Sequence, residues 1–138
     1  MKKFFTDGSA VPNPGAGGFA VICDGLPVAL GREKTSTNIR MEARALLAAY
    51  DLANGGDVIY TDSEFWVNVL TKWAPVWEKN NWTKKGGEIK NLDLVQKLYV
   101  VFRKKSGVEL RWTRSHVGTR GNELADEWAN KAREGVEL

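Results

Sequence analysis

The chain has 138 residues with one Cys and one His, and 20 Lys and Arg against 17 Asp and Glu give it a formal net charge of +3. This length fits a single domain, residues 1–138, that can bury its own core. One Cys cannot form a disulfide within the chain, and no apolar run approaches the roughly 20 residues of a membrane span. Asp7 follows Met1 too closely to leave room for a signal-peptide core. Secreted and membrane proteins are therefore excluded, and we expect a cytoplasmic one.

The first part of the chain predicts three short strands. Residues 3–6 form the first, and the turn-rich residues 13–18 lead to the second at 19–23. Asp24 and Gly25 make a two-residue hairpin signal, after which a third strand covers about 27–33. Strands joined by such short turns should be antiparallel neighbours.

The rest of the chain alternates helices with short strands. Residues 41–53 are good helix formers and stop at an Asn-Gly-Gly sequence, a strand follows at 58–61, and Ser63 caps a helix towards Thr71. A short helix at 73–80, an exposed loop at 83–90, a helix at 91–104, a strand at 108–113 and a helix at 122–133 complete the order. This order predicts an α/β fold with a mixed five-stranded sheet, three antiparallel strands followed by βα units, flanked by helices.

Four acids stand in unusual places. Asp7 and Asp62 each end an apolar strand, and if those strands pair in parallel the two carboxylates lie side by side. Glu42 falls in the first turn of an apolar helix, and Asp126 on a half-buried face of the last helix. Each alone is readily a turn, cap or surface residue, but clustered carboxylates repel and need a cation. Without His or Cys ligands, such a cluster suits Mg²⁺ or Mn²⁺.

The chain resembles the type 1 ribonucleases H over nearly its whole length, on motifs that stand in order. They are FTDGS at 5–9, NPGAGG at 13–18, TNIRME at 37–42, TDS at 61–63, and SHVG at 115–118 leading to NELAD at 122–126. One motif alone is weak, but five in order on a matching element pattern are specific. The resemblance implies the ribonuclease H-like fold and an endoribonuclease that hydrolyses the RNA strand of RNA–DNA hybrids with two Mg²⁺ ions, leaving 5′-phosphate and 3′-hydroxyl ends.

The resemblance also implies roles for particular residues. Asp7, Glu42, Asp62 and Asp126 would bind the two ions, with Asp7 bridging them and Glu42 also reaching the 2′-OH beside the cut, which helps to exclude DNA. His116, the only histidine, lies in a predicted loop and would shuttle a proton or help product release rather than bind metal.

Residues 72–90, here called the basic segment, hold five Lys, two Glu and three of the six Trp. Helix-spaced Trp73 and Trp77 could both anchor a helix in the core, and we expect Trp73 to do so. The remainder resembles the protruding element with which bacterial family members grip the DNA strand, through Trp77, Lys79, Trp82, Lys84 and Lys85. By the same resemblance, Asn13 and Thr37 would hold a DNA phosphate, and Asn38 would reach the minor groove.

The chain departs from the family pattern at two positions that would face the minor groove. Ile39 stands where a second Asn is common, and Glu64 where Gln is common. Ile39 removes a hydrogen-bonding group and Glu64 brings a negative charge near phosphate. Glu78, Asn80 and Thr83 also replace common basic residues in the basic segment. We therefore expect weaker or more metal-dependent hybrid binding than in a strongly basic relative.

Other functions remain open at this point. A metal-dependent nuclease of the same superfamily, such as a transposase core or an exonuclease, is disfavoured by the Gly-rich motif, the His motif and the basic segment. A hybrid-binding module that no longer cuts should lack a carboxylate, and all four are present. A domain cut from a polymerase polyprotein is also possible, although Met1 directly before the first strand favours a complete gene product. We also expect the protein to be a monomer.

Overall fold

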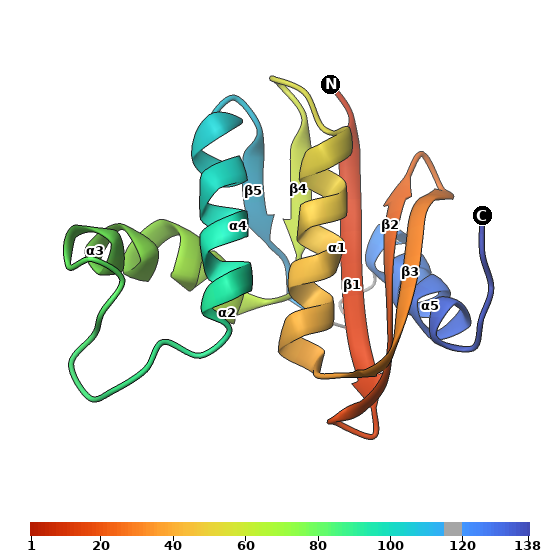
Figure 1. The fold of residues 1–138 in the computed structure, drawn as a ribbon. Helices are drawn as coiled ribbons and strands as arrows, with labels where there is room; N and C mark the ends of the chain where they lie inside the picture. The colour runs from red at the N-terminus through yellow and green to blue at the C-terminus, as the bar shows by residue number, and fades with distance from the viewer. Residues whose placement is uncertain (115–119) are drawn as a thin grey trace.

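The computed structural model describes residues 1–114 and 120–138 and contains one five-stranded sheet with strand order β3-β2-β1-β4-β5 (Figure 1). Strands β1 (Lys3–Val11), β2 (Gly15–Cys23) and β3 (Leu26–Ser36) are antiparallel, whereas β4 (Val58–Thr61) pairs in parallel with β1 and with β5 (Glu109–Trp112). The predicted fold class is confirmed. No helix of these described residues is long and apolar enough to cross a membrane.

Helices cover both faces of the sheet. Helices α1 (Asn38–Leu52) and α4 (Leu92–Lys104) lie on one face, and α5 (Arg120–Arg133) lies on the other, behind β1, β2 and β3 (Figure 1). The main core fills the space between the sheet, α1 and α4, with Leu46, Ile59 and Leu98 fully buried. A smaller cluster beneath α5 contains Ile22 and Leu124.

The segment after β4 is divided into three short helices. Ser63 caps α2 (Glu64–Asn68), as predicted, and its hydroxyl accepts a hydrogen bond from the Trp66 amide at 3.2 Å. A π-helical turn, η1 (Val69–Trp73), then leads into α3 (Ala74–Lys79), which has a proline in its first turn. Figure 1 shows α3 and the following loop standing away from the sheet beside α4. The predicted helix towards Thr71 and the short helix after it are therefore confirmed, with different bounds.

The first strand is longer than predicted, because the glycines after it do not all serve the turn. Strand β1 runs to Val11, and Gly15, Gly17 and Gly18 already belong to β2. A Cβ on Gly17 would lie 2.7 Å from the Met41 side chain of α1, and one on Gly18 would lie 2.4 Å from the Ala129 carbonyl of α5. These two glycines allow helices to pack closely on opposite faces of the same strand.

Candidate active site

Asp7 and Asp62 come from neighbouring parallel strands. Phe5 of β1 stands opposite Tyr60 of β4, and continuing this register by two residues places Asp7 opposite Asp62. The Thr6 hydroxyl donates a hydrogen bond to the Tyr60 carbonyl at 2.9 Å, which ties the strands together immediately before the two acids. The expectation that they lie side by side is confirmed. However, Asp7 lies in the middle of β1 rather than at its end, because β1 continues in its pairing with β2.

Glu42 reaches the same point from α1. This helix begins at Asn38, capped by the Thr37 hydroxyl, so Glu42 falls in its second turn rather than in the first turn as predicted. The earlier start comes from that cap, which the helix-forming residues from Met41 onward did not indicate. One oxygen of Glu42 accepts a hydrogen bond from the Gly8 amide at 3.1 Å.

Gly8 is the reason that helix and strand approach so closely. A Cβ at this position would lie 2.4 Å from the backbone carbonyl of Met41 and 2.7 Å from the Glu42 nitrogen. The Gly8 amide also donates to the Asp7 side chain at 2.9 Å, so one backbone N–H holds two carboxylates. Gly8 is therefore required for the close packing of α1 against β1, and it does not form a turn after Asp7.

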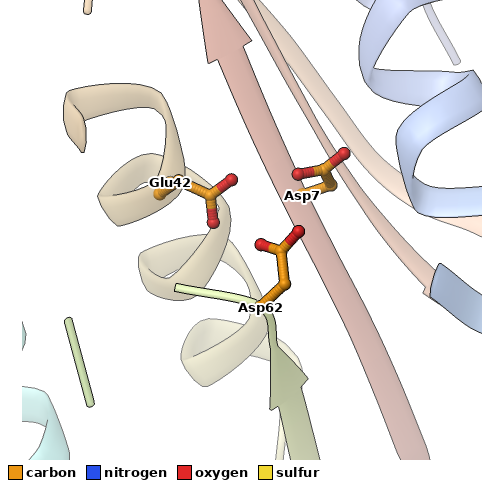
Figure 2. A group of neighbouring side chains, drawn as sticks. All are labelled: Asp7, Glu42 and Asp62. Atoms are coloured by element: carbon orange, nitrogen blue, oxygen red, sulfur yellow. The ribbon is translucent and has the colours of Figure 1, made fainter. Parts of the chain in front are cut away.

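The three carboxylates converge on one place, as Figure 2 shows. Asp7, Glu42 and Asp62 each offer one oxygen within 4.8 Å of the others, and all three are half-buried. Burial, together with the charges of Asp62 and Asp126, raises the pKa of Asp7 from 3.8 to about 7. Burial, with the charges of Asp7 and Asp62, raises the pKa of Glu42 well above its usual value. Without a positive charge, the site therefore resists full ionisation.

The arrangement fits a hard divalent cation. The second Glu42 oxygen is buried and has no hydrogen-bond partner among the described residues, a costly state that a bound cation would relieve. All three side chains in the cluster supply oxygen ligands, the donor type preferred by Mg²⁺ and Mn²⁺.

Two other predicted site residues, Asp126 and His116, are not part of this cluster of three described carboxylates. Asp126 is exposed on α5, which corrects its predicted place on a half-buried face, because Leu124 and Ala125 take the buried positions of that turn. It is not one of the three clustered carboxylates, although its charge is close enough to raise the pKa of Asp7. His116 lies outside the described residues, so its predicted role stays a prediction.

The predicted phosphate and minor-groove residues lie together at the start of α1. The Asn13 side chain accepts a hydrogen bond from the Asn38 amide at 3.0 Å, and the Asn38 side chain accepts one from the Ala10 amide at 2.8 Å. Thr37 caps the same helix. The oxygens of these three side chains are used to shape the backbone. Two of the departures from the family pattern also lie on the surface, since Ile39 is 38% exposed and Glu64 is exposed at the start of α2.

The tryptophans of the basic segment are arranged differently from the prediction. Trp73 was expected in the core but is 40% exposed, whereas Trp77 and Trp82 are half-buried and pack against the core. Trp82 meets the Tyr99 ring edge to face at 6.0 Å. Trp73 is the last residue of the π-helical turn η1, and this turn departs from the regular helical spacing that would have directed Trp73 towards the core. Lys79, Lys84 and Lys85 are exposed, as expected.

A cavity of about 370 Å³ separates the basic segment from α1. Its lining includes Ile39, Trp73, Trp77, Lys84 and Asn91. The sequence did not predict that Trp73 and Asn91 would line a surface beside α1. Asn91 has a left-handed backbone with φ of 59° and accepts a hydrogen bond from the Arg40 guanidinium at 3.2 Å. An Asn before a helix signals only a cap, so no local pattern pointed to its place beside α1.

The sequence matches those of known proteins. Residues 1–134 match the family model described as RNase H. The chain belongs to the type 1 ribonuclease H family. It is 38% identical over 138 residues to a ribonuclease H of Dichelobacter nodosus, covering 96% of this chain and 91% of that one. It is 40% identical over 134 residues to a ribonuclease H of Francisella philomiragia, covering 93% and 88%.

Solved structures agree with this assignment. LC9-RNase H1, described as a type 1 RNase H with the type 2 active-site motif, superposes with a TM-score of 0.81 at 29% identity, over 97% of this chain and 72% of that one. The PFV RNase H domain, at 21% identity and a TM-score of 0.76 over 99% of this chain and 96% of that one, shares the fold. The predicted family, fold and enzyme class, a ribonuclease H, are confirmed.

Proposed function

We propose that this ribonuclease H hydrolyses the RNA strand of RNA–DNA hybrids with two divalent cations, Mg²⁺ or in its place Mn²⁺, held by Asp7, Glu42, Asp62 and Asp126. The observation that carries the proposal is the convergence of three carboxylates within 4.8 Å, one of them with a pKa raised to about 7. Family membership supplies the reaction class. The products would carry 5′-phosphate and 3′-hydroxyl ends.

The cluster has the features that such a reaction needs. When bound, the cations would lower the pKa of the attacking water and offset charge on the scissile phosphate and the leaving 3′ oxygen. Asp7 lies close enough to Asp62 and Asp126 for their charges to raise its pKa, and by the family resemblance it would be shared by the two cations. Gly8 holds one Glu42 oxygen, which leaves the other for a cation. Glu42 would also approach the 2′-OH beside the cut, a group that DNA lacks.

The hybrid would lie across the cluster, between the start of α1 and the basic segment. Asn13, Thr37 and Asn38 would contact a DNA phosphate and the minor groove, using the donors that remain after their oxygens shape the backbone. On the other side, Lys79, Lys84 and Lys85 would contact phosphates.

Aromatic contacts with the DNA strand are also part of the proposal. The exposure of Trp73 supports this ring as a surface for a deoxyribose. Trp77 would contribute through the wall of the cavity that it shares with Trp73. Trp82 packs on Tyr99, so it would support the segment more than contact the substrate.

The remaining expectations also belong to this proposal. His116 would transfer a proton or assist product release. Residues 1–138 would work as a single domain, as a monomer and in the cytoplasm.

Glu64 would weaken hybrid binding through its charge, so Glu64→Gln should lower the Michaelis constant at matched salt. An unchanged constant would contradict that part.

One assay tests the main proposal. Labelled RNA–DNA hybrid, duplex RNA and duplex DNA are incubated with the protein in Mg²⁺, Mn²⁺ or chelator. We expect cleavage only of the RNA strand of the hybrid, and only with metal. Asp62→Asn should cut more than about 100-fold more slowly, because changes in the outer shell of metal sites already cost up to that much. Asp51→Asn, an exposed acid of α1, is the control and should cut normally.

Each contrary outcome has a separate meaning. Cleavage that survives chelation, or equal cleavage by Asp62→Asn, would exclude the metal mechanism. Cleavage of duplex DNA would exclude the substrate assignment. Hybrid binding without any cleavage would favour a hybrid-binding module that no longer cuts.

A further inference from the structure

The end of β5 is hydrogen-bonded directly to the backbone of Asp62. The Trp112 indole nitrogen donates a hydrogen bond to the Asp62 carbonyl at 3.2 Å. The Thr113 amide donates to the Thr61 carbonyl at 2.8 Å, which extends the parallel pairing of β4 and β5 by one residue. Thr113 is therefore held in place beside the acidic cluster by the backbone of the sheet.

The Thr113 side chain connects this strand end to α5. Its hydroxyl accepts a hydrogen bond of 2.7 Å from the side-chain amide of Asn122. Asn122 lies in the first turn of α5, and both residues are half-buried. Asp126 comes four residues after Asn122, so the two side chains lie on the same face of the helix, one turn apart.

The other contacts of α5 serve a different part of the sheet. Leu124 and Ala125 form a small core cluster with Ile22, and the last turns of the helix lie against Gly18. These contacts fix α5 over β1, β2 and β3. Among the described residues, the hydrogen bond between Asn122 and Thr113 joins its first turn directly to the end of β5, which is bonded to Asp62.

We infer that Asn122 and Thr113 form a positioning pair that sets the place of Asp126 relative to Asp7, Glu42 and Asp62, and thereby the affinity of the site for its divalent cations. This inference rests on the proposed function, in which Asp126 is the fourth metal-binding carboxylate. Neither residue of the pair touches substrate or metal. The pair acts by holding Asp126 within reach, so that the ion does not have to order α5 when it binds.

Metal binding without substrate separates positioning from catalysis. Binding of Mn²⁺ alone is measured by isothermal titration calorimetry at fixed pH, and the melting temperature is measured with chelator. Thr113→Val keeps the shape of the side chain but removes the acceptor, and we expect it to weaken Mn²⁺ binding roughly tenfold, the low end for supporting residues of metal sites. Thr113→Ser keeps the hydroxyl and should restore the affinity.

Two further variants complete the design. The double variant Thr113→Val/Asn122→Ala should bind Mn²⁺ no more weakly than Thr113→Val, because both changes break the same bond. Thr71→Val is the matched control, since the exposed Thr71 hydroxyl of η1 donates to the Val67 carbonyl at 2.7 Å. It should leave Mn²⁺ affinity unchanged.

Asp126→Asn distinguishes failure of this inference from failure of the proposed function. If Asp126→Asn weakens Mn²⁺ binding but Thr113→Val only lowers the melting temperature, the pair is structural and the inference is wrong. If Asp126→Asn leaves Mn²⁺ binding unchanged, Asp126 is not a ligand, and that part of the proposed function fails together with the inference.

Discussion

The acidic cluster and the basic segment are charged regions of opposite sign, and they are built in opposite ways. Asp7, Glu42 and Asp62 are placed by a paired strand register, a capped helix and one glycine, so that the backbone alone brings them together. The basic segment consists of short helical pieces and a loop. The exposure of its tryptophans differs, since Trp73 is 40% exposed whereas Trp77 and Trp82 pack against the core. A metal site requires fixed geometry, whereas a surface for phosphates requires mainly charge.

The largest effect expected from this contrast is on stability, at Gly8. Gly8→Ala would place a methyl group against the Met41 and Glu42 backbone, which cannot move away as a flexible side chain could. We expect the free energy of unfolding to fall by about 2–3 kcal/mol and Glu42 to shift, measured by urea denaturation and Mn²⁺ binding. Gly55→Ala is the control, because a Cβ there meets no atom within 4 Å. Equal stability of the two variants would show that α1 tolerates displacement.

The basic segment offers a matched pair of tryptophans. Trp77→Ala removes packing against the core and should lower the free energy of unfolding by about 2 kcal/mol. Trp73→Ala removes a 40% exposed ring, so it should cost less stability but weaken hybrid binding by about 1 kcal/mol. Binding is measured in an Asp62→Asn background, which prevents cleavage, and stability by urea denaturation. If Trp73→Ala instead cost more stability and Trp77→Ala more hybrid binding, Trp73 would be the core residue, as expected from the sequence.

Removing a charge from the acidic cluster should change how stability depends on pH. In the metal-free protein the pKa of Asp7 is about 7 folded, against 3.8 for an ordinary aspartate. The folded state therefore holds a proton that the unfolded state has lost between these values, so its stability falls as pH rises from about 4 to about 7. One such carboxyl contributes a slope of up to about 1.4 kcal/mol per pH unit.

Asp7→Asn should reduce that slope and make the chelated protein more stable than the parent above about pH 7. Denaturation curves in chelator between pH 5 and 8 measure it, with Asp51→Asn as the control. A slope unchanged by Asp7→Asn would mean that another group takes up the proton. Added Mg²⁺ should remove the difference, because the cation favours the ionised carboxylates.

The sequence predicted the acidic cluster well because its signals are local. Strand periodicity, the position of each acid in its element and the order of the motifs were enough to bring Asp7 and Asp62 together, and Glu42 with them. What was missed depends on long-range packing. The continuation of β1 past Asp7 is set by pairing with β2, and the start of α1 by the Thr37 cap.

The basic segment was predicted less well for a physical reason. Helical spacing allowed both Trp73 and Trp77 to enter the core, and Trp73 was expected there, but Trp73 ends the π-helical turn at residues 69–73, which departs from that spacing. The exposure of Asp126 was likewise hidden, since its neighbours Leu124 and Ala125 made the whole turn look half-buried. Charge and composition thus predicted the exposure of Lys79, Lys84 and Lys85 better than the orientation of the rings.

The smallest expected effect concerns the lysines of the basic segment. Lys84 is exposed and lines the cavity beside Trp73. If it contacts one phosphate, Lys84→Ala should reduce the slope of log affinity against log salt by about 0.9, with little change in stability. Lys97→Ala, an exposed lysine of α4 outside the segment, should leave the slope unchanged. Hybrid binding at several salt concentrations, in the Asp62→Asn background, measures both. Equal slopes for all three proteins would mean that this side of the hybrid is held by the aromatic rings rather than by charge.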